Sequence, residues 1–321
     1  SSVSNQIMEF HHIPILLPEC LTALEPERGG VFVDCTAGGG GHSFEIASRL
    51  PEDGHSRLIC LDRDDEAIAA CRARLSPLGD RFTIVKSNFR DLDAALRSVG
   101  VDHIDGVLWD LGVSSHQLDD AERGFSYTAD APLDMRMDQS AGLSASDVVN
   151  TYPEEELKRI LWIYGEEKFS GRVARAIVQR REKSPIRTTL ELAETVAGAI
   201  PTRQKESQHP ARRAFQAIRI EVNGELDAIE PSIRAAVEHM RPGGRLAVIT
   251  FHSLEDRIVK ETFRALATGC TCPPNFPVCV CGGKPKITLL SKKPIAPSEK
   301  ELSENPRSHS AKLRVAERTE F

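Results

Sequence analysis

Val31-Phe-Val-Asp34-Cys-Thr-Ala-Gly38-Gly-Gly-Gly41-His42 decides the fold of this chain, because it combines a buried strand, a glycine-rich turn and a helix start. Glycines let the backbone approach a ligand closely, and the first turn of a helix offers free N–H donors. A dinucleotide-binding turn would carry a third glycine where this chain has Ser43. The next expected strand ends in Asp62, 21 residues beyond Gly41, where a carboxylate usually holds ribose hydroxyls. The stretch therefore predicts nucleoside binding, and the alternative is a tight turn without a ligand.

The first third of the chain alternates short apolar runs with helical patterns. We expect buried strands at Val31–Asp34, Arg57–Asp62, 83–86 and 105–110, and helices at 42–50 and 66–75. Crossovers of this length join parallel strands, so these elements predict a mostly parallel sheet with helices on its faces. The fold class is therefore α/β.

The alternation stops after Asp110, and helical patterns dominate from 116 to 208. Residues 151–154 read as a capping box that starts a helix ending at Gly165. A strand returns at 245–251 after a turn at 241–244, and 311–316 could pair as an edge strand. We therefore expect a core made of 1–115 and 225–321, with a helical insertion at 116–224.

Composition places the chain among globular proteins, with 40% hydrophobic and 27% charged residues in a length of 321. A run of 18 apolar residues is absent from the sequence, and residues 1–10 do not resemble a signal peptide. We expect a cytoplasmic protein with no membrane partner. The net charge is −6, but 168–219 holds twelve Lys/Arg against four Glu, a net +8. Such asymmetry indicates either a polyanion partner or solvated helix faces.

Two features favour S-adenosylmethionine over NAD as the nucleoside ligand. The first strand ends in acidic Asp34, which suits a cationic ligand with an amino group better than a pyrophosphate. The fourth strand ends in Asp110-Leu-Gly-Val-Ser-Ser115, which brings polar groups to the edge of the sheet where ligands bind. Phe89 follows the third strand and could cover an adenine ring, or it could be a core aromatic.

These motifs make the chain similar to the RsmH (MraW) family of small-subunit ribosomal RNA cytosine-N4 methyltransferases. The resemblance covers residues 12 to about 318, in order. Besides the motifs above, it is carried by Asn88-Phe-Arg-Asp-Leu92, Gln117-Leu-Asp-Asp120, Glu122-Arg-Gly-Phe-Ser126, Pro132-Leu-Asp-Met-Arg-Met-Asp138, Phe215-Gln-Ala-Ile-Arg219 and Phe251-His-Ser-Leu-Glu-Asp-Arg257.

The resemblance implies a Rossmann-like methyltransferase core with an inserted helical domain that recognises RNA, and a small ribosomal subunit as substrate. It also implies that the methyl donor S-adenosylmethionine is held by Gly40, Gly41, His42, Asp62, Phe89, Asp110 and Gln117. Two positions depart from the family pattern. Gly39 stands where a larger residue is usual, and His116 stands where proline is common.

Methyl transfer to the exocyclic N4 of cytosine needs in-line alignment with the donor and an acceptor for the N4 proton, without a covalent intermediate. Asp110 is the candidate acceptor, although the family pattern favours a role in holding the donor. His252, at the end of the strand 245–251, could contact an extruded base. The alternative for His252 is a strand end followed by a helix capped by Ser253.

Residues 209–226 carry an apolar stripe beside a stripe of donors that suits phosphates and base edges. The candidate RNA-binding residues are Arg212, Arg213, Gln216, Arg219 and Asn223. Arg172, Arg175, Arg180 and Arg181 reinforce the prediction, and a solvated face is the alternative.

Four of the eight cysteines form two C-x-C pairs, Cys270, Cys272, Cys279 and Cys281. In a chain without a secretory signal, this spacing suggests a structural zinc ion rather than disulfides, and four reduced thiols are the alternative. The reading as a whole has two rivals: the same chemistry on another RNA or on DNA, and a ribosome-binding module without turnover. A homodimer is possible.

Overall fold

A computed structural model describes residues 13–201 and 208–321, and the chain divides into two compact units. The core unit comprises Ser1–Gly112 and Leu226–Phe321, and the inserted unit is Val113–Glu225. The sequence predicts an insertion at 116–224, so the observed unit starts three residues earlier and ends one residue later. Among the described residues, none of the helices combines the length and the apolar character needed to cross a membrane.

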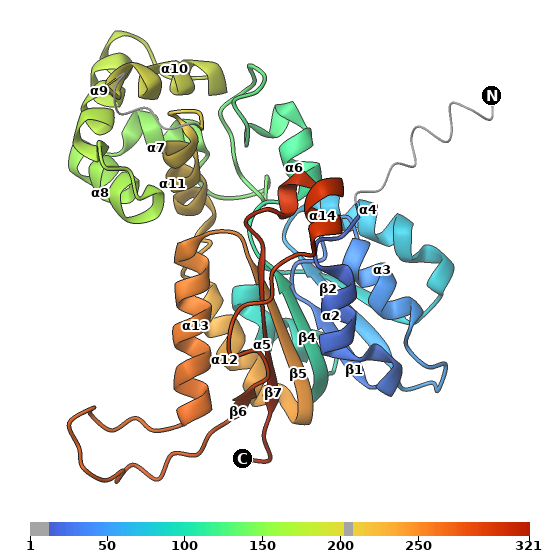
Figure 1. Cartoon of the computed structure of the whole chain (residues 1–321). Coiled ribbons are helices and arrows are strands. Elements are labelled where there is room, and N and C mark those ends of the chain that lie inside the picture. The colour runs from blue at the N-terminus through green and yellow to red at the C-terminus, as the bar shows by residue number, and fades with distance from the viewer. Residues whose placement is uncertain (1–12, 202–207) are drawn as a thin grey trace, which may run out of the picture. The chain divides into compact units, whose positions relative to one another are not determined.

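The core unit is built on a seven-stranded sheet in the order β3-β2-β1-β4-β5-β7-β6 (Figure 1). The strands are β1 (Val31–Asp34), β2 (Arg57–Asp62), β3 (Phe82–Lys86), β4 (Ile104–Asp110), β5 (Met240–Thr250), β6 (Ile287–Leu289) and β7 (Lys312–Arg318). β1 to β5 pair in parallel, whereas β7 pairs antiparallel with both β5 and β6. The predicted Rossmann-like α/β fold is confirmed.

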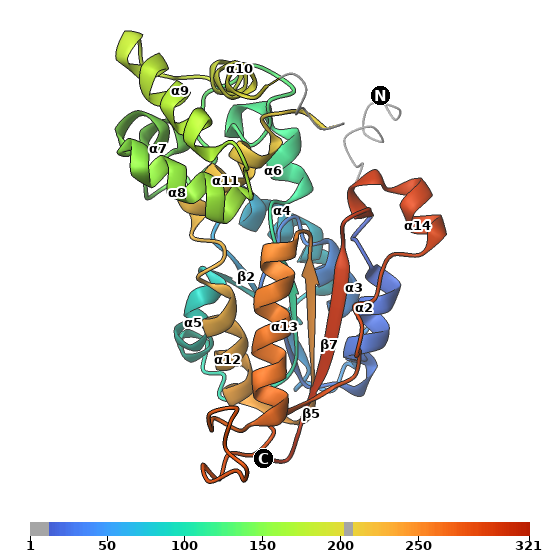
Figure 2. The ribbon, with the colours of Figure 1, turned by 60° about the vertical axis from the view of Figure 1, so that its left-hand side comes forward.

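Alternating side chains of the strands build a core on each face of the sheet, as the period of a strand requires. Phe32 packs on one face with Ile46 and Leu75, whereas Val33 packs on the other with Leu96. The helices of the first face are α2 (Leu17–Leu24), α3 (Gly41–Ser48) and α4 (Asp65–Leu75). Those of the second, shown in Figure 2, are α5 (Leu92–Ser98), α12 (Ile229–His239) and α13 (Ser253–Thr268).

The carboxy-terminal strand β7 is an inner strand, so the expectation of an edge strand at 311–316 is wrong. β6 covers its outer side, because Thr288 pairs with Glu317. The expected turn at 241–244 is also wrong. These residues belong to an irregular part of β5. The pairing register with β4 shifts there, between Ile104 and Gly106, and Gly243 has a φ of 85°. Short helical segments complete the core unit at α14 (Glu299–Glu304), Pro26–Arg28, Ser76–Leu78, Phe89–Asp91 and Pro306–Ser308.

In the inserted unit α11 packs against α7 and α8, and α9 packs against α7, α8 and α10. Its elements are α6 (Ser115–Asp119), Ala121–Arg123, α7 (Ala145–Thr151), α8 (Glu154–Gly165), α9 (Ser170–Lys183), α10 (Thr189–Ala199) and α11 (Arg212–Asn223). The glycine at the end of α8 lets α8 and α11 cross closely, since a Cβ on Gly165 would lie 2.6 Å from the carbonyl oxygen of Arg213. The capping box predicted at 151–154 is wrong: the Thr151 hydroxyl donates to the Asp147 carbonyl within α7, and α8 has no side-chain cap.

The loop 132–138 is bound inside the inserted unit by two polar side chains, which gives this sequence motif a structural role. The side-chain oxygen of Asn223 accepts from the Met137 N–H at 2.9 Å, and its amide nitrogen donates to the Met135 carbonyl. The buried guanidinium of Arg123 donates to the carbonyls of Arg136 and Met137 at 2.9 and 3.1 Å. Two polar side chains from distant positions therefore satisfy the backbone of one buried loop.

Gly124 tests the packing of this loop. Its φ of 74° is strained for any other residue, and a Cβ there would lie 2.3 Å from the Pro132 carbonyl oxygen. We expect Gly124→Ala to destabilise the inserted unit by about 3 kcal/mol or more, from backbone strain and overpacking together. Hydrogen exchange in α8 and α11 with increasing urea would measure this loss.

The matched control is Gly142→Ala. Gly142 has φ 80°, but a Cβ there would meet no atom within 4 Å. It should cost only about 1–2 kcal/mol. Equal losses in the two variants would contradict the role assigned to the loop packing.

Candidate active site

Three strands bring carboxylates to the same edge of the core sheet. Asp34 ends β1 and pairs with Cys60 and Leu108, so Asp62 and Asp110 end the two flanking strands just beyond it. The chain crosses from β3 to β4 at this point, which makes it the switch point of the strand order. Ligands of open α/β sheets bind in the crevice beyond such carboxyl ends.

The glycine turn between β1 and α3 is closely packed at two positions and open at the position before them. Gly40 caps α3 with φ 87°, and a Cβ there would lie 3.2 Å from the Cα of Cys71. A Cβ on Gly41 would lie 2.8 Å from Pro14. At Gly39, by contrast, it would meet no described atom within 4 Å. The turn therefore has space for a larger residue at position 39.

Asp34 is a buried structural carboxylate, which corrects the expectation that it faces a cationic ligand. Its side chain is 1% exposed and accepts hydrogen bonds from the Ser43 hydroxyl at 2.6 Å and the Thr36 N–H at 3.1 Å. Burial raises the pKa of Asp34. Ser43 thus replaces the third glycine of a dinucleotide fingerprint with a side chain that binds the end of β1.

Asp62 is bound to the backbone of the turn. Its two carboxylate oxygens accept from the N–H groups of Gly38 and Asp64 at 2.8 and 2.9 Å. Each oxygen has a second lone pair, so the group can still accept from ribose hydroxyls. Burial raises the pKa of Asp62 to about 6, and the N–H donors partly oppose this shift.

Asp110 and His42 lie close together at the end of β4. The Asp110 N–H donates to the Thr36 hydroxyl at 2.6 Å, which ties β4 to the glycine turn. His42 donates through Nε2 to the Ile15 carbonyl at 2.8 Å, because a carbonyl can only accept, and its Nδ1 lies 3.7 Å from Asp110 Oδ2. Burial raises the pKa of Asp110 to about 6, although 28% of its side chain stays exposed.

The structure places the other candidates in three different settings. Phe89 begins a short helical turn beyond β3 and packs partly against the core. Gln117 lies in the inserted unit, where its side chain and Ser114 form the capping box of α6. His252 is itself the cap of α13, because its Nδ1 accepts from the Glu255 N–H at 3.4 Å. The expected cap, Ser253, is therefore wrong.

Several of the α11 candidates for RNA binding are engaged within the inserted unit. Asn223 is buried against the loop 132–138, and Arg219 forms a bidentate ion pair with Glu225 at 3.0 and 3.1 Å. Gln216 donates to the Tyr164 carbonyl at 2.9 Å. Arg213 approaches the Glu166 carbonyl at 3.4 Å, and Arg212 is half-buried.

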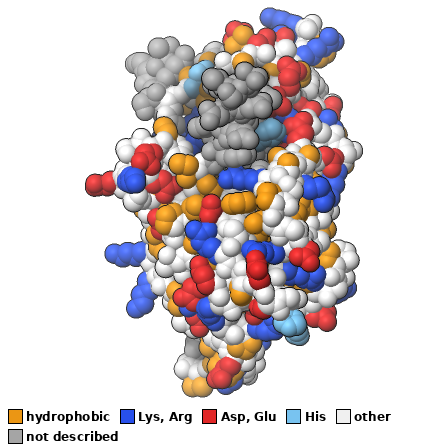
Figure 3. Space-filling model, turned by 90° about the vertical axis from the view of Figure 1, so that its right-hand side faces the viewer, with side chains coloured by type: hydrophobic (Ala, Val, Ile, Leu, Met, Phe, Trp, Pro, Cys, Tyr) orange, Lys and Arg blue, Asp and Glu red, His pale blue; other side chains and the backbone are white. Residues whose placement is uncertain are grey.

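Other basic side chains of the inserted unit also bind backbone carbonyls. Arg172 donates to Ala199, Arg180 to Ser184, and Arg181 to Val149 and Tyr152. Arg203 and Lys205 of the basic segment lie outside the described residues. Figure 3 shows one face of the molecule, where side chains of both charges are interspersed.

Two residues near these sites were missed by the sequence analysis. Thr36 links Asp34 to Asp110 through its N–H and its hydroxyl. A hydroxyl side chain between a buried strand and the first glycine of the turn was the sequence signal that could have indicated this role. Trp162 on α8 is 60% exposed, and its place outside the apolar stripe of that helix, at Leu157, Ile160, Leu161 and Tyr164, could have identified it.

The sequence model of the MraW methylase family matches residues 9–319. The chain belongs to this family. Family membership confirms the predicted resemblance and makes the chain an S-adenosylmethionine-dependent methyltransferase.

Curated relatives from three bacteria match almost their whole length and bear the name ribosomal RNA small subunit methyltransferase H. The relative from Brevibacillus brevis is 55% identical over 97% of this chain and 99% of its own length. Those from Paenibacillus sp. and Carboxydothermus hydrogenoformans are 56% and 54% identical, over 96% and 98% of this chain and 99% and 100% of their own lengths.

The raised pKa values predict how affinity for the methyl donor depends on pH. If Asp62 accepts hydrogen bonds as a carboxylate, protonation below about pH 6 should weaken binding of S-adenosylmethionine. We expect about tenfold weaker binding at pH 5 than at pH 7.5 for each carboxylate that must be ionised. Calorimetric titration of the whole chain with S-adenosylmethionine at the two pH values would measure this difference in affinity.

The stability of the unliganded protein should change with pH in the opposite direction, falling as the pH rises. A native pKa above the ordinary 3.8 means that the folded state binds more protons between pH 4 and 6, so these groups lower the free energy of unfolding as pH rises. Asp62→Asn, which cannot titrate, is the control for both effects. An Asp62→Asn variant with an unchanged pH profile would contradict the assignment.

Proposed function

We propose that this chain transfers the methyl group of S-adenosylmethionine to N4 of a specific cytidine in small-subunit ribosomal RNA. The observation that carries the proposal is the cluster of strand-end carboxylates and the glycine turn at the switch point of the sheet. The names of the relatives point to the same substrate. We place the reaction in the cytoplasm, where small subunits are assembled.

The residues at the strand ends fit the methyl donor. Asp62 can accept from ribose hydroxyls, and Gly40 and Gly41 let the turn pack closely against Cys71 and Pro14, which would position its backbone for the donor. Phe89 supplies an apolar surface for the adenine, and Asp110, His42 and Gln117 complete the proposed set. When bound, the sulfonium of S-adenosylmethionine supplies an electrophilic methyl group.

The cysteines of the core disfavour methylation at C5 of the base, which requires a thiolate nucleophile. Burial raises the pKa of Cys20 and Cys35 well above the ordinary value, and Cys35 is the one at the glycine turn. The pKa of Cys60 is also raised, first by its hydrogen bond with Cys71 and then by burial. Each of these shifts disfavours the thiolate that such a nucleophile needs.

Asp110 is the residue best placed to accept the proton that N4 loses. Of the two carboxylates at this edge with a pKa of about 6, it ends the strand next to β5, whose end carries His252. A base with a pKa near the working pH is efficient in proton transfer. His42 keeps its imidazole beside Asp110 through the bond to Ile15, so we assign His42 a positioning role. His252 remains a candidate for contact with the base.

For RNA recognition we propose a smaller set than the sequence stripe. Arg212 and Arg213 lie in the first turn of α11 with half-buried side chains, and they would contact phosphates. Exposed Trp162 offers a ring on which one base could stack. Asn223, Gln216 and Arg219 would support this surface through the contacts described above. A homodimer stays a prediction that analytical ultracentrifugation can measure.

The chemistry is tested with Asp110→Asn on small subunits from cells that lack this protein. We expect single-turnover methyl transfer at saturating donor to fall by about 10²-fold or more, since a general base contributes 10²–10⁴. Label from the donor should appear in N4-methylcytidine after digestion to nucleosides. Glu230→Gln, an exposed carboxylate paired with Arg234 on α12, should keep full activity.

Two outcomes would change the assignment. Weaker donor binding with an unchanged saturating rate would make Asp110 a donor-binding residue only. Wild-type label in another nucleoside, or label on naked DNA, would overturn the proposed substrate. Binding of subunits without any transfer of label would favour a binding module.

The RNA surface is tested with the double variant Arg212→Ala, Arg213→Ala. Losing two phosphate contacts should raise KM for subunits about tenfold and reduce the dependence of log affinity on log salt by about 1.4–1.8. Arg234→Ala, which removes an exposed cation from α12 in the core unit, is the matched control. A kcat effect with unchanged KM would contradict phosphate binding by these arginines.

A further inference from the structure

A long loop joins α13 to β6 and carries four cysteines at the edge of the core unit away from the glycine turn (Figure 1). Between Thr268 and Ile287 the structure has no helix and no strand. The apolar side chains of this loop do not pack inward: Phe276, Val278 and Val280 are 47%, 70% and 74% exposed. A loop of this length without a core of its own needs another source of order.

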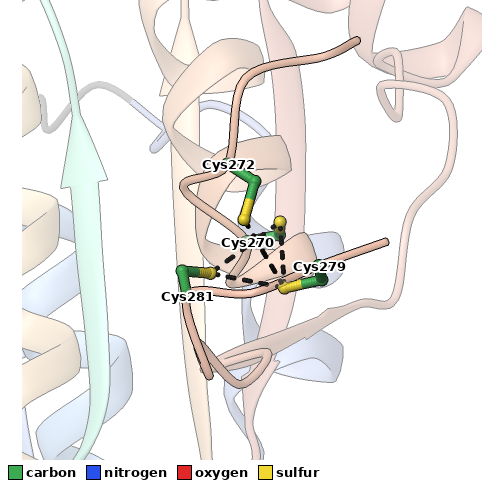
Figure 4. Close-up of side chains that lie close together, drawn as sticks. All are labelled: Cys270, Cys272, Cys279 and Cys281. Atoms are coloured by element: carbon green, nitrogen blue, oxygen red, sulfur yellow. Dashed lines mark hydrogen bonds between the residues drawn. The ribbon is translucent and has the colours of Figure 1, made fainter. Parts of the chain in front are cut away.

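The four cysteine sulfurs converge on one point, as Figure 4 shows. All four lie within 4.8 Å of one another. Cys279 Sγ lies 3.3, 3.4 and 3.9 Å from the sulfurs of Cys270, Cys281 and Cys272, and Cys270 lies 3.9 Å from Cys281. Four sulfurs around one Zn²⁺ at 2.3 Å would form a tetrahedron with edges of about 3.8 Å. The observed sulfur–sulfur separations lie on both sides of this value, close enough for one ion to contact all four sulfurs after small side-chain shifts.

Other uses of four cysteines fit the geometry less well. Two disulfides would bring the sulfurs together in two pairs at about 2.05 Å, whereas Cys279 is nearly equidistant from Cys270 and Cys281. An iron–sulfur cluster separates its cysteines, because each thiolate binds iron at the periphery of a cluster that also holds inorganic sulfide. A single ion with four thiolate ligands is the simplest occupant.

The backbone around the cysteines is arranged to stabilise thiolates. N–H groups of Thr271 and Gly283 point to Cys281 Sγ at 3.4 Å, and that of Val280 points to Cys272 Sγ at 3.2 Å. Such second-layer hydrogen bonds orient and tune metal ligands.

Glycines close the base of the loop. A Cβ on Gly283 would lie 1.9 Å from the Gly269 carbonyl oxygen, and one on Gly269 would lie 2.1 Å from that of Lys284. The two ends of the loop therefore run in contact, which holds both C-x-C pairs close together.

We propose that Cys270, Cys272, Cys279 and Cys281 bind one structural Zn²⁺. Four thiolates close the coordination shell and leave no position for substrate, so the ion does not take part in methyl transfer. Its distance from the glycine turn supports this role. α13 starts at the carboxyl edge of β5 and runs 16 residues, about 24 Å, before the first cysteine. The ion orders the loop, and the proposal stands independently of the RNA substrate.

The test measures metal in the whole protein, purified under reducing conditions without a metal-affinity column. Mass spectrometry of the metals should find about one zinc per chain. Cys272→Ser and Cys279→Ser should each reduce zinc to near zero. Val278→Ala, which shortens a 70% exposed side chain of the same loop, should keep full zinc content and is the matched control.

Exchange with Co²⁺ gives a second readout that does not depend on folding of a variant. The cobalt form of the wild type should show the strong visible bands of tetrahedral thiolate coordination, and Zn²⁺ should displace them. Removal of the metal with a chelator should make the loop 270–281 sensitive to protease while methyl transfer persists.

Three results would overturn the proposal. One is a wild-type chain without zinc whose four loop thiols all react with a thiol reagent under native conditions. Another is a mass two or four units lower than the reduced chain, which means disulfides. The third is stoichiometric iron in place of zinc.

Discussion

A buried carboxylate at the end of β1 is the constraint on which the site depends. Asp34 binds Ser43 of α3 and the backbone of Thr36, and the Thr36 hydroxyl binds the backbone of Asp110 at the end of β4. One network therefore fixes the turn, the helix start and the neighbouring strand together. Because buried polar groups are costly when left unpaired, the network admits one arrangement of these elements. This network therefore sets the positions of the groups that would face the ligand.

The sequence predicts the core well where the local pattern and the fold agree. β1 and β2 lie at the predicted residues, and the glycine turn lies between them as expected. Burial on both faces makes such strands continuous apolar runs, and parallel pairing places all their carboxyl ends at one edge. Asp62 and Asp110 could therefore be assigned to the site from position alone. The structural role of Asp34 could not be predicted in the same way. Asp34 is buried because α3 packs over it and Ser43 donates a hydrogen bond to it.

The sequence predicts the inserted unit less well, since its polar residues act through partners far along the chain. The donors on α11 suggest a nucleic-acid surface, yet Asn223 binds a loop 88 residues earlier, at Met135. An amide that binds backbone carbonyls and one that binds a base edge have the same residue type and the same helical spacing. Only the burial of the helix distinguishes them. Trp162 shows the converse, a large apolar side chain that the fold leaves exposed.

The inner position of β7 governs when the core unit can form during synthesis. β4 and β5 are separated in sequence by the whole inserted unit, and β7 must pair between β5 and β6 to complete the sheet. The inserted unit is continuous and can fold while the last strand is still inside the ribosome. Until Lys312–Arg318 emerges, one side of β5 exposes unpaired backbone that could join another chain. Completion of the methyltransferase core therefore waits for Lys312–Arg318, which are made long after the inserted unit.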